Sequence, residues 1–245
     1  MKQNKKGKYF KYAIGEIILV VIGILIALQI NNWNENRKLQ QREVQILKEI
    51  KSDLYQTKKD IERAVTMHKE VLVTNKYVLD AIHLKIPYSD SIYGGFADAS
   101  QEFEIVPKTS GFENLKTIGL NTISNDSLRI AISNIFQLRF TRLQNDMRSK
   151  GTEFNIQSML FPHQDKYFEV DFSKARKIPR KYSDTLKMFS LKIRNYDDFL
   201  KDTELFKFLQ LTTIIRSSIV EDEMEVVGEI DQVIESIDQE LKRKN

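Results

Sequence analysis

The chain has no cysteine, and it is poor in proline, glycine and tryptophan, with four, nine and one among 245 residues. The lack of cysteine excludes disulfides, thiol nucleophiles, thiolate metal sites and lipid attachment to a cysteine. Neither proline nor glycine occurs from residue 24 to residue 86, so nothing in that stretch interrupts a helix. The sequence also lacks G-x-S-x-G, H-E-x-x-H, P-loop and dinucleotide-binding patterns. We therefore predict no catalytic residue, no bound cofactor and no enzyme activity.

What the sequence does contain is one long apolar run, from Ala13 to Ile30, which reads AIGEIILVVIGILIALQI. It holds a single charged residue, Glu16. At about 1.5 Å per residue it would extend roughly 27 Å, close to the ~30 Å hydrocarbon thickness of a bilayer. Aromatic side chains suited to the membrane interface, Tyr12 and Trp33, flank it. We predict a transmembrane helix over residues 12–33.

The distribution of charge predicts the topology. The net charge is +4, and it arises from five lysines in residues 1–11 against the one acidic residue in the apolar run, so the rest of the chain is neutral. A basic tail of this kind stays cytoplasmic, which would place residues 34–245 outside the cytoplasmic membrane. No small-residue cleavage site follows the run, which favours an uncleaved signal anchor. A nucleic-acid partner is disfavoured, because the folded domain carries no basic excess.

Two long stretches have apolar residues at alternating steps of three and four, the spacing of coiled-coil-like helices. The first comprises Leu47, Ile50, Leu54, Thr57, Ile61, Ala64, His68, Val71, Asn75, Val78 and Ile82. The second comprises Leu209, Thr212, Arg216, Ile219, Glu223, Val226, Ile230, Val233 and Ile237. We predict an all-α fold, with helices over about 35–84 and about 203–242 as the long sides of an elongated antiparallel bundle.

The sequence between these helices is less regular. We expect a loop at 86–108, where a Gly-Gly pair is read as a turn, and irregular structure at 162–182. Ser110 and Glu113 fit a capping box for a short helix that Gly119 ends, and a further helix is expected to begin near Asn125 or Asp126. One more short helix is expected at 154–161, after a break near residue 151.

One stripe of the predicted transmembrane helix is a candidate interface. Glu16, Gly23 and Ala27 lie within about 40° of one another around the helix axis. Gly23 and Ala27 also form a small-xxx-small pair, which lets two helices approach closely. The partner would be a second copy or another membrane protein. In the alternative interpretation, Glu16 reaches the lipid headgroups or pairs with Lys8 or Lys11.

His68 and Asn75 are polar residues at positions of the first helix that are otherwise apolar. Polar residues at such positions commonly determine register or oligomeric state, and we predict that role for both. A metal site is disfavoured, because His68, His83 and His163 have no ligand spacing.

Two charged regions allow two interpretations. The first contains Lys174, Arg176, Lys177, Arg180 and Lys181, and the second contains nine acidic residues between residues 221 and 240. They could form a patch for anionic lipid or another envelope polymer. The interpretation that we favour is that both are solvated faces, with exposed ion pairs worth ~0–1 kcal/mol each.

The segment YAIGEIILVVIGILIALQINNWNENRK, residues 12–38, resembles the N-terminal signature of an uncharacterised Gram-negative family, domain of unknown function 6090. A looser likeness includes the segment SGFENLKTIGLNTISNDSLR at 110–129 and the closing long helix. The resemblance implies a single-pass protein of the inner membrane with a helical periplasmic domain. It implies no activity.

These observations favour a membrane-anchored interaction or scaffold module. The alternative is a small-ligand sensor with a pocket near residues 86–123 that would be lined by Tyr88, Tyr93, Phe96, Phe103 and Phe112. A tail of about eleven residues is too short for an output domain, so such a sensor would have to act through a partner membrane protein.

Overall fold

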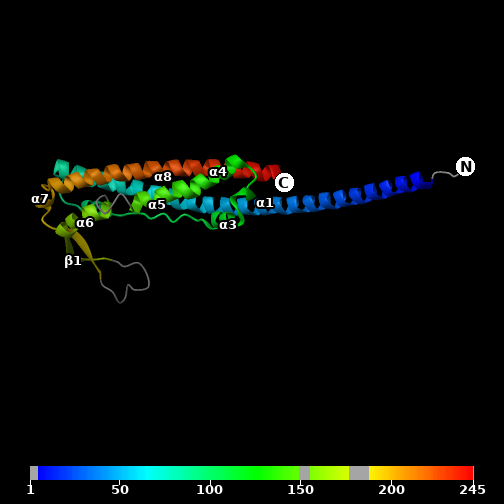
Figure 1. The fold of residues 1–245 in the computed structure, drawn as a ribbon. Coiled ribbons are helices and arrows are strands. Elements are labelled where there is room, and N and C mark those ends of the chain that lie inside the picture. The colour runs from blue at the N-terminus through cyan, green and yellow to red at the C-terminus, as the bar shows by residue number, and fades with distance from the viewer. Residues whose placement is uncertain (1–4, 149–154, 177–187, 245) are drawn as a thin grey trace.

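The computed structural model describes residues 5–148, 155–176 and 188–244. Its longest element is α1 (Lys5–Leu84), a single helix of 80 residues. Figure 1 shows the N-terminal part of α1 extending well past the rest of the molecule, while its second part forms one long side of a bundle. The predicted long helix, continuous with the apolar run, is confirmed.

The closing helix, α8 (Thr203–Lys244), runs antiparallel to α1 and forms the other long side (Figure 1). Asp202 caps its N-terminus, since its Oδ1 accepts a hydrogen bond from the backbone N–H of Leu205 at 2.8 Å. Lys58 on α1 reaches Asp231 on α8 at 2.6 Å. The two helices therefore lie side by side over most of the length of α8.

Shorter helices lie along and beside this pair of helices, while the strand segment projects away from one end of the bundle (Figure 1). The helical elements are α2 (Asp90–Asp98), α3 (Ser110–Ile118), the 3-10 turn η1 (Leu120–Thr122), α4 (Asp126–Asn134), the π-helical turn η2 (Ile135–Arg139), α5 (Phe140–Arg148), α6 (Ile156–Tyr167) and α7 (Tyr196–Phe199). The strands are β1 (Phe168–Arg176) and β2 (Met188–Ile193). The all-α prediction is confirmed, with one small two-stranded sheet added to it.

Helix α2 occupies part of the region predicted to be a loop, and the Gly-Gly pair lies inside it, so that prediction is wrong. The reason is the close approach of α1. A Cβ built on Gly95 would lie 2.7 Å from Cγ2 of Val78 and 2.8 Å from the carbonyl oxygen of Thr74. Glycine is needed here for helix contact, and the buried side chains of Ile92 and Phe96 hold α2 in place.

In the described part of the region predicted to be irregular, 162–176, the chain continues α6 to Tyr167 and then forms β1, so the prediction is wrong there; residues 177–182 lie outside the described residues. Strand β1 pairs antiparallel with β2, and Phe168 lies opposite Ile193 with an irregularity between residues 171 and 175. Phe168 packs edge-on against Phe96 of α2. Alternation of apolar and polar residues from Phe168 was the signal for a strand. The expected break near residue 151 lies outside the described residues, while the short helix expected at 154–161 is present as α6.

The helix boundaries predicted between residues 109 and 126 are confirmed only in part. Gly119 ends α3 with a φ of 103°, and Asn125 caps α4 by accepting from the backbone N–H of Leu128 at 3.2 Å, both as predicted. The capping box of α3 is wrong. Thr109 is the N-cap, and the hydroxyl of Ser110 donates to a carboxylate of α1 instead.

Candidate functional site

The apolar part of α1 is uncovered. It is long and apolar enough to cross a membrane, with a mean hydropathy of 2.3 over 18 residues, and none of that window is buried in the described structure. Glu16, Gly23 and Ala27 are all exposed there. A Cβ built on Gly23 would meet nothing within 4 Å in the described part of the chain. Contacts within this chain therefore do not explain why a glycine stands at this position.

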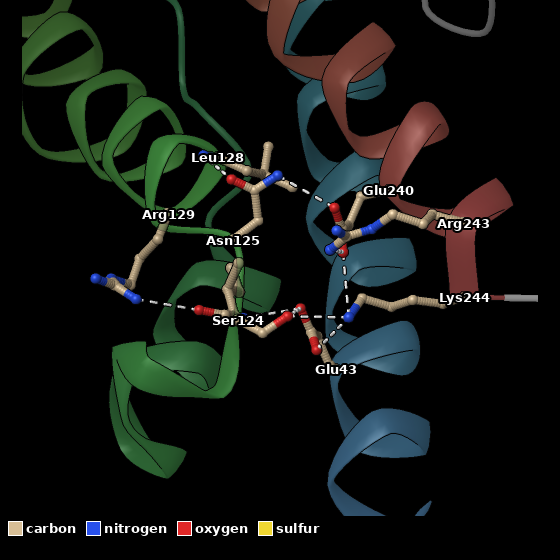
Figure 2. Close-up of polar contacts among 9 residues, drawn as sticks. Glu43, Ser124, Asn125, Leu128, Arg129, Glu240, Arg243 and Lys244 are labelled. Atoms are coloured by element: carbon tan, nitrogen blue, oxygen red, sulfur yellow. Dashed lines mark hydrogen bonds and ion pairs between the residues drawn. The ribbon is translucent and has the colours of Figure 1, made fainter.

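Beyond this window, polar side chains from α1, α8 and the turn before α4 meet around Lys244 (Figure 2). Its Nζ lies 2.8 Å from Oε2 of Glu43 and 3.1 Å from Oε1 of Glu240. Glu43 accepts two hydrogen bonds from Ser124, from the backbone N–H at 2.9 Å and from the hydroxyl at 3.0 Å. Asn125 donates to Glu240 at 3.1 Å. We call these five residues the basal clasp.

The two carboxylates of the basal clasp are buried, and Arg243 adds a second cation beside Glu240. Glu43 is 3% exposed and Glu240 is 4% exposed. Burial by itself raises the pKa of Glu240, but the hydrogen bonds from Arg243, Asn125 and Lys244 lower it to about 2. Burial lowers the pKa of Lys244, and its bonds to the two carboxylates raise it above the ordinary value overall. Glu240 and Lys244 therefore stay ionised near neutral pH, and the clasp holds the end of α8 on α1.

The segment from residue 110 to residue 125 is held along α1 by carboxylates of that helix. Asp53 accepts hydrogen bonds from the hydroxyl of Ser110 at 3.0 Å and from the backbone N–H of Gly111 at 2.6 Å. A Cβ at Gly111 would lie 2.7 Å from the backbone nitrogen of Ile50, so a larger residue does not fit. The start of the segment is thus bound at Asp53 and its end at the basal clasp.

Further along the bundle, three ionisable side chains are buried between α1 and α8. We call His68, Arg216 and Glu223 the buried polar layer; each is at most 1% exposed. Arg216 donates to Nδ1 of His68 at 2.7 Å. Because a guanidinium only donates, Nδ1 accepts and the ring proton lies on Nε2. Nε2 in turn lies 3.6 Å from Oε1 of Glu223, too far for a hydrogen bond.

Burial determines the ionisation of this layer. It raises the pKa of Glu223 to about 8, against the opposing charge of Arg216. Burial and the charge of Arg216 lower the pKa of His68 to about 4. Burial also lowers the pKa of Arg216, to about 10, while Glu102 and Glu223 oppose that change. At neutral pH the layer thus contains one buried cation, a neutral histidine and a mostly protonated carboxyl group.

Asn75 is fully buried, and neither of its side-chain polar atoms has a hydrogen-bond partner in the described structure. His68 is hydrogen-bonded to Arg216 and not to Asn75, so no hydrogen bond joins the two predicted register residues in the described structure. Their register role stays a prediction. No role was predicted for Arg216 or Glu223 from the sequence. The available signal was that both are charged residues at positions of α8 where the spacing calls for apolar ones.

The aromatic residues predicted to line one pocket do not lie together. Phe96 and Phe112 lie in two separate core clusters, with Tyr93 beside the first and Phe103 beside the second, so the predicted common pocket is wrong. Of the basic residues, Lys174 pairs with Asp90 at 2.8 Å, while Lys177, Arg180 and Lys181 lie outside the described residues. Within the described ranges, no group of three His, Asp or Glu side chains could hold a metal ion.

Two long antiparallel helices, one of which continues into an uncovered apolar segment, define a helical-bundle protein with one candidate membrane-spanning helix. The chain belongs to the Family of unknown function (DUF6090), whose model matches residues 16–178. The match begins within the apolar window and includes Glu43, Asp53 and the segment that these residues hold. Neither the curated proteins nor the solved structures that were compared include a match to this chain.

Proposed function

We propose that this protein is a non-enzymatic, single-pass membrane protein that anchors a helical interaction or scaffold module in the periplasm of a Gram-negative bacterium. The observation that carries the proposal is the uncovered apolar window of α1, which continues without interruption into the bundle. The N-terminal tail would be cytoplasmic and the bundle periplasmic, as the lysine distribution favours.

Energetics support insertion of the window into a bilayer. Twelve isoleucine, leucine and valine side chains between Ile14 and Ile30 are exposed. At ~0.3–0.6 kcal/mol each they favour insertion by about 4–7 kcal/mol. The opposing contribution of Glu16 is limited, because it lies near one end of the window, where a long side chain can reach the interface. Insertion is therefore favoured overall.

Single-cysteine labelling tests the topology, since the natural chain has no cysteine. Lys242→Cys places a thiol on an exposed position of α8, and Gln3→Cys places one in the tail. A membrane-impermeant maleimide should label Lys242→Cys in intact spheroplasts and Gln3→Cys only after lysis. Recovery of the chain in the soluble fraction, or the reverse labelling pattern, would contradict the proposal.

The stripe of Glu16, Gly23 and Ala27 is the proposed contact with a second copy or another membrane protein. Gly23→Leu should reduce crosslinking of the full chain in native membranes, because the added side chain separates the two helices. Gly15→Leu is the matched control, since it adds the same bulk about 100° around the helix axis from Glu16, which is the centre of the stripe. Mass spectrometry of the crosslinked species identifies the partner. Equal crosslinking in both variants would count against the stripe.

The second candidate, ligand sensing through a partner, is supported by one surface groove between α1 and residues 102–106. The apolar side chains of Ala64, Met67, Phe103 and Val106 line it, together with charged side chains that include Arg63. A thermal-shift screen of the full chain in mild detergent against envelope metabolites tests this function, because a bound ligand raises the melting temperature. No shift across a broad panel would count against sensing.

A further inference from the structure

A length of irregular chain, residues 99–108, crosses the bundle over the buried polar layer, and we call it the strap. It leaves the end of α2 and leads to α3. The ring of Phe103 meets the ring of His68 edge-on, at 4.8 Å between centroids. Ile105, also a strap residue, is 3% exposed and packs into the core. The strap thus covers the His68 side of the layer without being part of a helix or strand.

The strap is bound at both ends by buried side chains of the long helices. Arg216 donates from Nη2 to the carbonyl oxygens of Ala99, at 3.1 Å, and Gln101, at 2.7 Å. At the other end, the backbone N–H of Lys108 donates to the hydroxyl of Thr57 at 2.9 Å. The same guanidinium that touches His68 therefore also holds the strap closed.

Hydrogen bonding within the layer is incomplete: Nε2 of His68 and Nε of Arg216 lack a partner in the described structure, and Glu223 makes no side-chain hydrogen bond at all. Neither carboxyl oxygen has a hydrogen-bond partner in the described structure, and the side chain is 1% exposed. The ionisable groups that act on it or beside it are His68 from α1, Arg216 from α8 and, on the strap, Glu102, whose charge acts on Arg216. A buried carboxylate without hydrogen bonds is strongly disfavoured, whereas the protonated form is tolerated.

We propose that the strap is a proton-operated cover, closed over the buried polar layer while Glu223 carries a proton and opened when that carboxyl ionises. Opening hydrates the carboxylate and exposes Phe103 and Ile105. The strap is the element that yields, because it is irregular chain, while α1 and α8 are held by continuous helical hydrogen bonds.

The linkage between proton release and strap opening gives the size of the pH effect on the open fraction. The pKa of Glu223 is about 8 in the closed state and near the ordinary 4.5 once hydrated, so opening releases one proton between these values. The open fraction then rises about tenfold per pH unit. Below pH 6.5 the lowered pKa of His68 opposes this change, since opening would let the imidazole take up a proton. Between pH 6.5 and 8 the pH dependence of opening is therefore expected to come from Glu223 without opposition from His68.

Hydrogen exchange of the full chain in lipid nanodiscs, corrected for intrinsic exchange rates, tests the proposal. Protection of residues 99–108 should fall about tenfold per unit from pH 6.5 to 8, while α1 at the basal clasp stays protected. Glu223→Gln, which is neutral and of equal size, should keep the strap protected across this range. Glu221→Gln, an exposed change on the same helix, should behave as the natural chain does.

Three outcomes would overturn the proposal. The first is strap protection in the natural chain that does not depend on pH. The second is equal loss of protection in the strap and at the basal clasp, which indicates global unfolding. The third is an unchanged pH dependence in Glu223→Gln. The first two are read from the natural chain alone, so the test does not depend on whether the variant folds.

Discussion

Lys244 and Glu43, 201 positions apart in the sequence, form an ion pair at 2.8 Å that joins the end of α8 to α1. Glu43 lies ten residues beyond Trp33, which corresponds to about 15 Å of helix. The pair therefore closes the bundle near the place where the uncovered part of α1 begins. In the proposed topology this is the end of the bundle that faces the membrane.

Removing the lysine should open that end. Lys244→Met leaves Glu43 and Glu240 as buried carboxylates without their shared cation, and we expect a loss of roughly 3 kcal/mol in the free energy of unfolding. Lys242→Met, an exposed change in the same turn, should have little effect. Urea denaturation of the full chain in mild detergent, followed by circular dichroism, measures both. Equal midpoints for the two variants would show that the ion pair is unimportant for stability.

The two adjacent glycines of α2 should respond in opposite directions to alanine. Gly94→Ala faces open space and should stabilise the helix by up to about 1 kcal/mol. Gly95→Ala forces its methyl group against Thr74 and Val78 and should destabilise the protein by about 1–3 kcal/mol. The difference between their thermal melting temperatures checks the close contact of α2 with α1. Stabilisation by both changes would contradict it.

Asp53→Ala should release the start of α3 from α1. The change leaves the backbone N–H of Gly111 without its acceptor, and we expect a loss of about 2 kcal/mol. Asp60→Ala is the control on the same helix, because that carboxylate is half exposed and lies 4.0 Å from Lys108. Denaturant midpoints measure both, and hydrogen exchange should locate the loss of protection in residues 110–118. A uniform loss along the chain would argue against local release.

Thermal stability should depend on pH through Glu223. Because its folded pKa is raised to about 8 from 4.5, the stability present at low pH is lost as the pH rises through 8. His68, whose folded pKa is lowered to about 4 from 6.5, acts oppositely between those values. We therefore expect the melting temperature to fall between pH 6.5 and 8. Glu223→Gln should flatten the profile there, and a profile identical to that of Glu221→Gln would contradict this assignment.

Local patterns in the sequence were sufficient for the long elements. The apolar run, the absence of proline and glycine from residue 24 to residue 86, and the caps at Asn125 and Asp202 act within one helical turn or along one helix. Backbone hydrogen bonds in a helix join residues four apart, so such features are readable from neighbouring residues. The family signature in residues 12–38 is of the same kind, and the family match confirms it.

Features that depend on distant residues were missed or only partly predicted. Gly95 reads as a turn residue until α1 is placed against it. Strand β1 is stable because β2 pairs with it and α2 covers Phe168. From the sequence Ser110 resembles a helix cap, but its hydroxyl donates a hydrogen bond to Asp53, which lies 57 positions earlier.

By itself the sequence determined the uncovered apolar helix, the two long helices and the excess of charge beside the apolar run, because each follows from hydrophobicity, charge or helical period. Only the tertiary structure decided that His68 meets Arg216, 148 positions away, that the strap binds Arg216 and packs on His68, and that Glu223 is buried beside them. The physical reason is that burial changes the chemistry of these groups. In water a histidine and a glutamate titrate near pH 6.5 and 4.5, and packing between α1 and α8 moves both values.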